Sequence, residues 1–237
     1  MTVAKKDTVW ITGASSGIGK SLVKIFTSNN IHVTATARRI SELEKLKSEI
    51  NNSELLCIEM TDMSSRSSIE NFFENIGGKY NFTGLINNAG VTSFSKAVDD
   101  SVEKIEEIIN TNLLGSIYAI KSVLPDMINK GDGIIINILS VVTKRIFTAS
   151  SAYSASKNGL MAYTNVLREE LRDKNIRIIN VSPGATATPI WPEKVLSSKS
   201  DKMMNPDDIA NLLFTLYKNK SNLVAEDITL RPISGDL

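Results

Sequence analysis

Apolar, β-rich runs alternate along this chain with longer amphipathic stretches. Strand-like runs cover residues 8–12, 33–37, 55–59, 84–87, 134–139, 176–181 and 228–230. Helix-like stretches lie between them at residues 18–28, 41–50, 65–76, 102–127, 152–173 and 206–218. Because strands that alternate with helices form βαβ units, the pattern predicts an α/β fold: a doubly wound parallel sheet of about seven strands with helices on both faces. We expect one domain over residues 1–237.

The composition is that of an ordinary globular protein, with 42% hydrophobic residues, 22% charged residues and a net charge of +1. Without a basic excess, we expect small-molecule partners rather than nucleic acid or a membrane surface. No apolar run approaches the roughly 20 residues of a membrane span. The single cysteine, Cys57, lies in a run predicted to be a buried strand, and it has no second cysteine to pair with. These features predict a cytoplasmic protein.

A glycine-rich segment, TGASSGIG at residues 12–19, joins the first predicted strand to the first helix. Glycines permit the tight turn and let a pyrophosphate approach backbone N–H groups at the helix N-terminus. The spacing is G-x-x-x-G-x-G rather than the commoner G-x-G-x-x-G, and a plain glycine-rich turn is the alternative. With a strand before it and a helix after it, the segment predicts a Rossmann-type dinucleotide site. The residues assigned to it are Gly13, Ser15, Ser16, Gly17, Ile18 and Gly19.

The end of the second predicted strand carries Arg38 and Arg39 where NAD-selective proteins have an acidic residue. Arg38 can pair with a 2′-phosphate and Ser15 can add a hydroxyl, which favours NADP(H). The alternative is that both arginines are solvated loop charges. After the third strand, Asp62 and Met63 are placed to flank the adenine, although Asp62 would serve equally well as a helix N-cap.

Tyr153 and Lys157 share one face of a predicted helix because they are four residues apart. A phenol is a slow acid at neutral pH, so we predict that the nearby ammonium lowers the pKa of Tyr153. Ser140, at the end of the fifth strand, would orient a carbonyl oxygen and stabilise the charge that develops on it. Each residue alone has an ordinary structural explanation, but together they predict a proton-transfer site.

These motifs resemble those of the short-chain dehydrogenase/reductase family over nearly the whole chain. The resemblance implies that the NNAG segment, with Asn88, Ala89 and Gly90, lines the adenosine side. It implies that Pro183, Gly184 and Thr188 lie at the nicotinamide. It also implies a catalytic tetrad in which Asn112 holds a water that links Lys157 to solvent; the tetrad is Asn112, Ser140, Tyr153 and Lys157.

Three functions remain open from these residues. The preferred one is NADP(H)-dependent reduction of a ketone or aldehyde to an alcohol, or the reverse, with Tyr153 as general acid or base. A 3-oxoacyl thioester reductase would need a basic patch at the pocket mouth, for which Lys194, Lys199 and Lys202 are the candidates, although solvated charges explain these lysines better. A non-catalytic NADP-binding sensor or interaction module is the alternative of another class.

The segment 186–205 is the least regular long connection, and we predict that it forms a substrate lid. Trp10 is expected in the core, whereas Trp191 lies in the lid and either packs there or touches substrate. His32, the only histidine, has no partners for a metal site. The resemblance also implies a homodimer or homotetramer, paired through the helices at 102–127 and 152–173.

Overall fold

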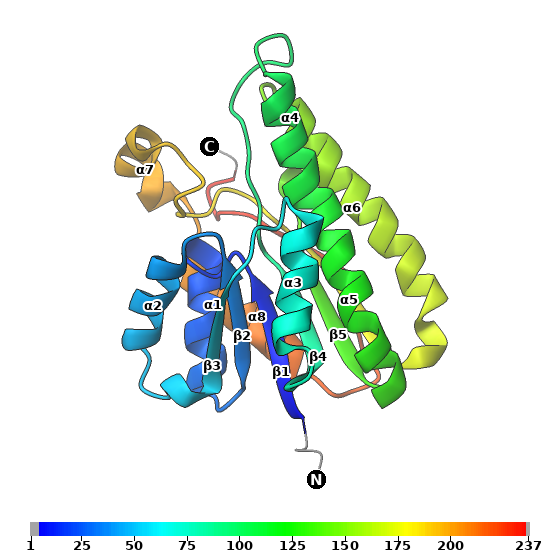
Figure 1. Ribbon diagram of the computed structural model, residues 1–237. Coiled ribbons are helices and arrows are strands. Elements are labelled where there is room, and N and C mark those ends of the chain that lie inside the picture. The colour runs from blue at the N-terminus through cyan, green and yellow to red at the C-terminus, as the bar shows by residue number, and fades with distance from the viewer. Residues whose placement is uncertain (1–4, 236–237) are drawn as a thin grey trace.

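The computed structural model describes residues 5–235, and within them one parallel sheet runs through the centre of the molecule (Figure 1). Its seven strands lie in the order β3-β2-β1-β4-β5-β6-β7, and every neighbouring pair is parallel. The predicted doubly wound sheet is therefore confirmed. The strands are β1 (Lys6–Thr12), β2 (Val33–Ala37), β3 (Leu56–Met60), β4 (Tyr80–Asn87), β5 (Gly133–Ile138), β6 (Ile176–Pro183) and β7 (Asp227–Leu230).

Helices cover both faces of the sheet and divide the apolar core in two. One cluster packs α1, α2 and α8 against one face, and the other packs α3, α5 and α6 against the opposite face. Trp10 is fully buried in the second cluster, as predicted. Between residues 5 and 235, no helix combines the length and apolar character needed to cross a bilayer. The helices are α1 (Gly17–Ser28), α2 (Ile40–Ser48), α3 (Arg66–Ile76), α4 (Val102–Ile109), α5 (Gly115–Lys130), α6 (Ser151–Glu170), α7 (Glu193–Lys199) and α8 (Pro206–Lys218).

The strand order reverses between β1 and β4, which are neighbours although two strands separate them in sequence. Loops that leave the carboxyl ends of these two strands turn to opposite faces of the sheet, and the gap between them is where open α/β sheets bind ligands. The glycine-rich loop follows β1, and the NNAG segment begins at the last residue of β4. The fold thus brings both motifs to one crevice.

Two local predictions were wrong. The stretch 102–127 is not one regular helix, because a π-helical turn at Asn110–Leu114 separates α4 from α5, which ends at Lys130. A single inserted residue leaves the apolar spacing almost unchanged, so the sequence does not reveal it. Cys57 is only half-buried, because β3 forms the edge of the sheet and pairs with β2 alone.

The predicted lid, residues 186–205, is an excursion whose two ends are tied together. Thr186 and Met204 form an isolated parallel bridge, in which Ala187 N–H donates to the Met204 carbonyl and Met204 N–H donates to the Ala185 carbonyl. Helix α7 lies inside the excursion and stands away from the sheet in Figure 1. The two ends of the segment are therefore held together by this bridge, just after the end of β6.

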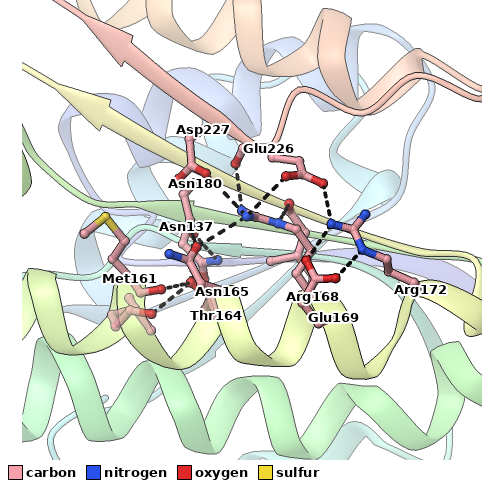
Figure 2. Close-up of polar contacts among 12 residues, drawn as sticks. Asn137, Met161, Thr164, Asn165, Arg168, Glu169, Arg172, Asn180, Glu226 and Asp227 are labelled. Carbon is pink, nitrogen blue, oxygen red and sulfur yellow. Dashed lines mark hydrogen bonds and ion pairs between the residues drawn. The ribbon is translucent and has the colours of Figure 1, made fainter.

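A row of asparagines crosses the sheet under α6. Asn87, Asn137 and Asn180 are in register on β4, β5 and β6; Asn87 Nδ2 donates to Asn137 Oδ1 at 2.9 Å, and Asn137 Nδ2 donates to Asn180 Oδ1 at 3.1 Å. Thr164 and Asn165 of α6 continue the row, since Asn180 Oδ1 accepts from the Thr164 hydroxyl and Asn180 Nδ2 donates to Asn165 Oδ1. Figure 2 shows how this row reaches Arg168.

Arg168 joins three elements at the far end of the asparagine row (Figure 2). Its side chain is 8% exposed, and its guanidinium donates to the Ile178 carbonyl of β6, to Asn165 of α6 and to the carbonyl of Glu226. It also forms an ion pair with Asp227 at 3.3 Å. Since every donor group has an acceptor, Arg168 secures the edge strand β7 against α6.

Candidate active site

A cleft of about 850 Å³ opens along the carboxyl ends of the strands, over the β1/β4 switch point. It runs from the loop after β2, past the glycine-rich loop, to the N-terminal half of α6 and the lid. One continuous cleft therefore touches all the motifs that the sequence singled out.

The glycine-rich loop forms the floor of the middle of the cleft. Gly13 adopts φ +65°, a left-handed conformation that favours glycine. Helix α1 begins at Gly17, and neither a side-chain cap from the described residues nor an acidic residue in its first turn offsets its N-terminal charge. Free N–H groups and the positive end of the helix dipole point to an anion site. Thr188 of the lid lies over this loop, 2.8 Å from where a Gly17 Cβ would stand.

Arg38 and Arg39 line the end of the cleft beyond this loop, and both are exposed. Arg39 Nη2 donates to Ser15 Oγ at 3.2 Å, so it is Arg39 that meets this serine. Arg38 instead forms an ion pair with Glu107 of α4, with 3.3 Å between Nη1 and Oε1. Lys104 Nζ lies 2.8 Å from the second oxygen of Glu107. At this end of the cleft, Arg38 and Lys104 thus share the Glu107 carboxylate, whereas Arg39 is bonded to Ser15.

Lys104, helped by Arg38, holds the pKa of Glu107 below its usual range. The carboxylate is therefore ionised at neutral pH, and it would compete with a bound phosphate for Arg38. Nothing in the sequence links position 107 to position 38, so this acid is absent from the predicted site. The i, i+3 spacing of Lys104 and Glu107 was its only visible signal.

Two buried hydroxyls in the cleft wall, those of Thr61 and Thr111, have no hydrogen-bond partner among residues 5–235. Buried polar groups are normally satisfied, so such atoms indicate a ligand or water contact. Asp62 and Met63 lie beside them in the cleft wall. Asp62 Oδ1 accepts from both N–H and Oγ of Ser64, whereas Ser65 caps α3, so the alternative of Asp62 as the helix N-cap is wrong.

Ser140 and Tyr153 meet at the inner end of the cleft. Ser140 caps the short turn after β5, where its Oγ accepts from Val142 N–H. Burial raises the pKa of Tyr153, and the neighbouring Ser140 side chain opposes this rise. The predicted lowering of this pKa by Lys157 is therefore not found, because desolvation of the phenolate dominates and Ser140 is the group that opposes it.

Lys157 is buried on the same face of α6, with its Nζ 5.7 Å from the centre of the Tyr153 ring. Its Nζ donates to the Ile138 carbonyl at 2.7 Å. Desolvation lowers the pKa of Lys157 to about 8, so the ammonium form still prevails at neutral pH. The lysine is a positive charge held within reach of both the phenol and the cleft.

Asn112 lies in the π-helical turn behind Lys157 and is fully buried. Its Oδ1 accepts from Val91 N–H, and its Nδ2 donates to the Val91 carbonyl and to Ser156 Oγ. The side chain therefore ties the NNAG segment to α6 and does not line the cleft. A π-helical turn at this point is typical of functional sites.

The end of the cleft away from Arg38 and Arg39 is lined by apolar and aromatic side chains. Phe94, from the connection between β4 and α4, stacks on Trp191 of the lid with ring centroids 5.2 Å apart and planes 21° apart. Phe147, from the loop before α6, and Ile190 also line this end. The sequence predicted that the segments 93–98, 141–149 and 186–205 shape the substrate pocket, but no motif marked Phe94 or Phe147 individually within them.

Most predicted site residues line the cleft, and only Gly19 and Asn112 lie behind its wall. Gly19 packs α1 on the loop, since a Cβ there would stand 2.4 Å from the Gly13 carbonyl oxygen. The candidate thioester-carrier lysines, Lys194, Lys199 and Lys202, do not line the cleft. The predicted residues in its wall are Gly13, Ser15, Ser16, Gly17, Ile18, Arg38, Arg39, Asp62, Met63, Asn88, Ala89, Gly90, Ser140, Tyr153, Lys157, Pro183, Gly184 and Thr188.

Comparison with known proteins agrees with this geometry. The model of the short chain dehydrogenase family matches residues 7–198. The chain belongs to this family. Among short-chain dehydrogenase relatives, a sepiapterin reductase from Chlorobaculum tepidum is 33% identical over 98% of each chain. An NADP-dependent 3-hydroxy acid dehydrogenase from Schizosaccharomyces pombe is 30% identical over 95% of this chain and 92% of its own.

Solved structures extend the comparison to three dimensions. A metagenomic short-chain oxidoreductase, crystallised in complex with NADP, superposes with a TM-score of 0.83 at 27% identity and covers 96% of this chain and 97% of its own. The family, the Rossmann-type fold and the oxidoreductase class are thus all shared with proteins of known structure.

Proposed function

We propose that this short-chain dehydrogenase is an NADP(H)-dependent oxidoreductase that interconverts a carbonyl compound and its alcohol. The observation that carries the proposal is the grouping of Ser140, Tyr153 and Lys157 at the inner end of a cleft whose middle suits a pyrophosphate.

The cleft suits a dinucleotide with a 2′-phosphate. The uncapped N-terminus of α1 would take the pyrophosphate, and the partnerless hydroxyls of Thr61 and Thr111 lie where a ribose or adenine would supply partners. Arg38 and Arg39 would hold the 2′-phosphate, together with Ser15. The NADP-dependent relative and the NADP complex described above support the same choice. When bound, NADPH supplies a hydride.

Tyr153 acts as the acid in the reductive direction. Because burial raises the pKa of Tyr153, the phenol is protonated at neutral pH and ready to donate to the carbonyl oxygen. Ser140 orients that oxygen, and Lys157 stabilises the phenolate left after the transfer. Asn112 bonds to Val91, in the segment after β4, and to Ser156 of α6, so it holds these two parts of the site together. Its role in a water relay remains a prediction.

The alternatives are weaker on this geometry. A 3-oxoacyl thioester reductase would need a basic patch at the mouth, and the lid lysines considered for it lie outside the cleft wall. A non-catalytic sensor would have no physical need for a phenol, a serine and a lysine in this arrangement. The single domain, the cytoplasmic location and the homodimer or homotetramer remain predictions.

The test is an assay of the purified chain with NADPH and with NADH against ketones, aldehydes, quinones, sugars and acyl thioesters. We expect oxidation of NADPH with at least one carbonyl class and a preference for NADPH over NADH. Preference for NADH would contradict the role of Arg38. Binding of NADPH without turnover across the whole panel would favour the sensor.

A further inference from the structure

The substrate end of the cleft differs in charge from its cofactor end. Arg38, Arg39, Asp62, Lys104 and Glu107 all line the cofactor end. Around the substrate end, Lys157 is the one charged side chain among the described lining residues, and it already donates to the Ile138 carbonyl beneath Tyr153. A carboxylate bound there would lack a cation of its own.

Apolar rings form the outer wall of this uncharged end. The Phe94–Trp191 stack connects the loop after β4 with the lid, and Phe147 and Ile190 line the same wall. Phe94 is nevertheless 49% exposed and Ile190 39% exposed. Large apolar side chains exposed together in a cleft indicate a ligand that covers them.

The neighbouring cations add no charge to the wall of the cleft at this end. Lys144 and Arg145 are exposed on the loop that carries Phe147, and Lys194 is exposed on α7, but none of the three lines the cleft. The polar lining groups at this end are neutral hydroxyls, such as those of Thr92, Thr148 and Ser150. These groups can hydrogen-bond a neutral substrate but cannot neutralise an anion.

We propose that the substrate is an uncharged carbonyl compound that carries a flat aromatic group next to its C=O, and that this group packs against the Phe94–Trp191 pair. This inference rests on the proposed function. The carbonyl carbon would gain a hydride from NADPH, its oxygen would gain the Tyr153 proton, and NADPH would be oxidised to NADP⁺. The 3-hydroxy acid dehydrogenase relative, whose substrate bears a carboxyl group, would differ from this chain in the substrate that it accepts.

A pair of related substrates tests the charge. Benzoylformate and its methyl ester share the same aryl ketone, but the acid carries a negative charge where the ester carries a methyl group, which also makes the ketone more electrophilic. Because an unpaired carboxylate loses its hydration without compensation, we expect kcat/KM for the ester to exceed that for the acid by about 100-fold. Equal turnover of acid and ester, or turnover confined to anionic or aliphatic carbonyls, would overturn the inference and leave the reductase function standing. Loss of all carbonyl turnover would instead contradict the reductase function.

Substitutions in the apolar wall of the cleft test which residues contact the aromatic group of the substrate. Trp191→Leu should lower kcat/KM for the aryl ester about 10-fold through lost ring packing, and should change that for butane-2,3-dione much less. The control is Ile146→Ala, because Ile146 is fully exposed and lies outside the cleft wall.

Ile190→Arg should supply the missing cation and raise the ratio of acid to ester turnover about 10-fold. An unchanged ratio in Ile190→Arg, or equal losses on both ketones in Trp191→Leu, would count against the inference.

Binding can be read without turnover because the chain has two tryptophans, and Trp10 is fully buried. With NADP⁺ present, methyl benzoylformate should quench tryptophan fluorescence in the wild type and in Ile146→Ala but not in Trp191→Phe. Quenching that persists in Trp191→Phe would contradict contact with the Phe94–Trp191 pair.

Discussion

Helix α6 carries a different buried polar cluster at each end. Near its N-terminus, Tyr153 and Lys157 face the cleft with few partners, and burial opposes the charged form of both. Near its C-terminus, Thr164, Asn165 and Arg168 belong to a network that runs from Asn137 of β5 through Asn180 of β6 to Asp227 of β7 (Figure 2). The same helix therefore places titratable side chains at the cleft at one end and bonds to the sheet at the other.

The difference lies in how completely the polar groups are satisfied. The Arg168 guanidinium donates to the Ile178 carbonyl and to the Glu226 carbonyl, so removal of that side chain would take away both of these bonds. The Tyr153 side chain lies beside Ser140 and lines a cleft. Titratable groups whose pKa values are shifted by burial, in a cleft, are typical of functional sites.

The largest expected effect is on activity at the N-terminal end. Tyr153→Phe removes the proton donor, so kcat should fall about 10²–10⁴-fold while the free energy of unfolding changes by less than about 1 kcal/mol. Steady-state kinetics and urea unfolding measure the two quantities. Turnover that persists in Tyr153→Phe would rule out this residue as the acid.

The C-terminal end should respond in the opposite way. Arg168→Met should lower the free energy of unfolding by about 3 kcal/mol, since it removes a buried guanidinium that donates to the Ile178 and Glu226 carbonyls and forms an ion pair with the exposed Asp227 carboxylate. Arg172→Met is the matched control, because Arg172 is 52% exposed in its pairs with Glu169 and Glu226 and should cost less than about 1 kcal/mol. Equal losses in the two variants would remove the contrast between the ends of α6.

The pH dependence of stability sharpens the contrast further. The pKa of Lys157 is about 8 in the folded chain, whereas an ordinary solvated lysine has a pKa of 10.5, so the unfolded chain binds more protons between these values. Stability should therefore rise with pH in that window, by about 2 kcal/mol from pH 8 to pH 10. Lys157→Met should remove this rise, measured as the difference between wild type and variant in urea unfolding. The raised pKa of Tyr153 acts with the opposite sign, mainly above pH 10, and is common to both proteins.

The smallest expected effect lies at the cofactor end. Glu107→Gln would free Arg38 from its carboxylate partner and remove an anion near the 2′-phosphate site, so the Kd for NADPH should fall about 3-fold, with no such change for NADH. Glu106→Gln is the control, because it makes the same charge change at an exposed position of α4. Fluorescence titration with each cofactor measures Kd. Weaker NADPH binding in Glu107→Gln would mean that Glu107 helps to position Arg38.

Much of the fold followed from the sequence because its signals are local. Apolar runs and amphipathic periods marked the sheet and its helices, although the π-helical turn at Asn110–Leu114 escaped notice because it barely changes that periodicity. The edge position of β3, which leaves Cys57 half-buried, depends on strand order and has no local signature.

The candidate site divides in the same way. Short motifs placed Gly13, Ser140, Tyr153 and Lys157 beside one cleft because strand ends and helix turns fix such spacings. No motif predicted the Arg38–Glu107 ion pair, because its partners are 69 residues apart and meet only after the sheet is assembled.

By itself, the sequence determined the order of strands and helices, the family and the set of reactive side chains, because each depends on neighbours a few residues away. Only the tertiary structure decided which cation holds which oxygen, how uncharged the substrate end is, and that burial raises rather than lowers the pKa of Tyr153 in the free protein. The physical reason is that desolvation and long-range pairing depend on every group packed around a side chain, and those groups come from distant parts of the chain.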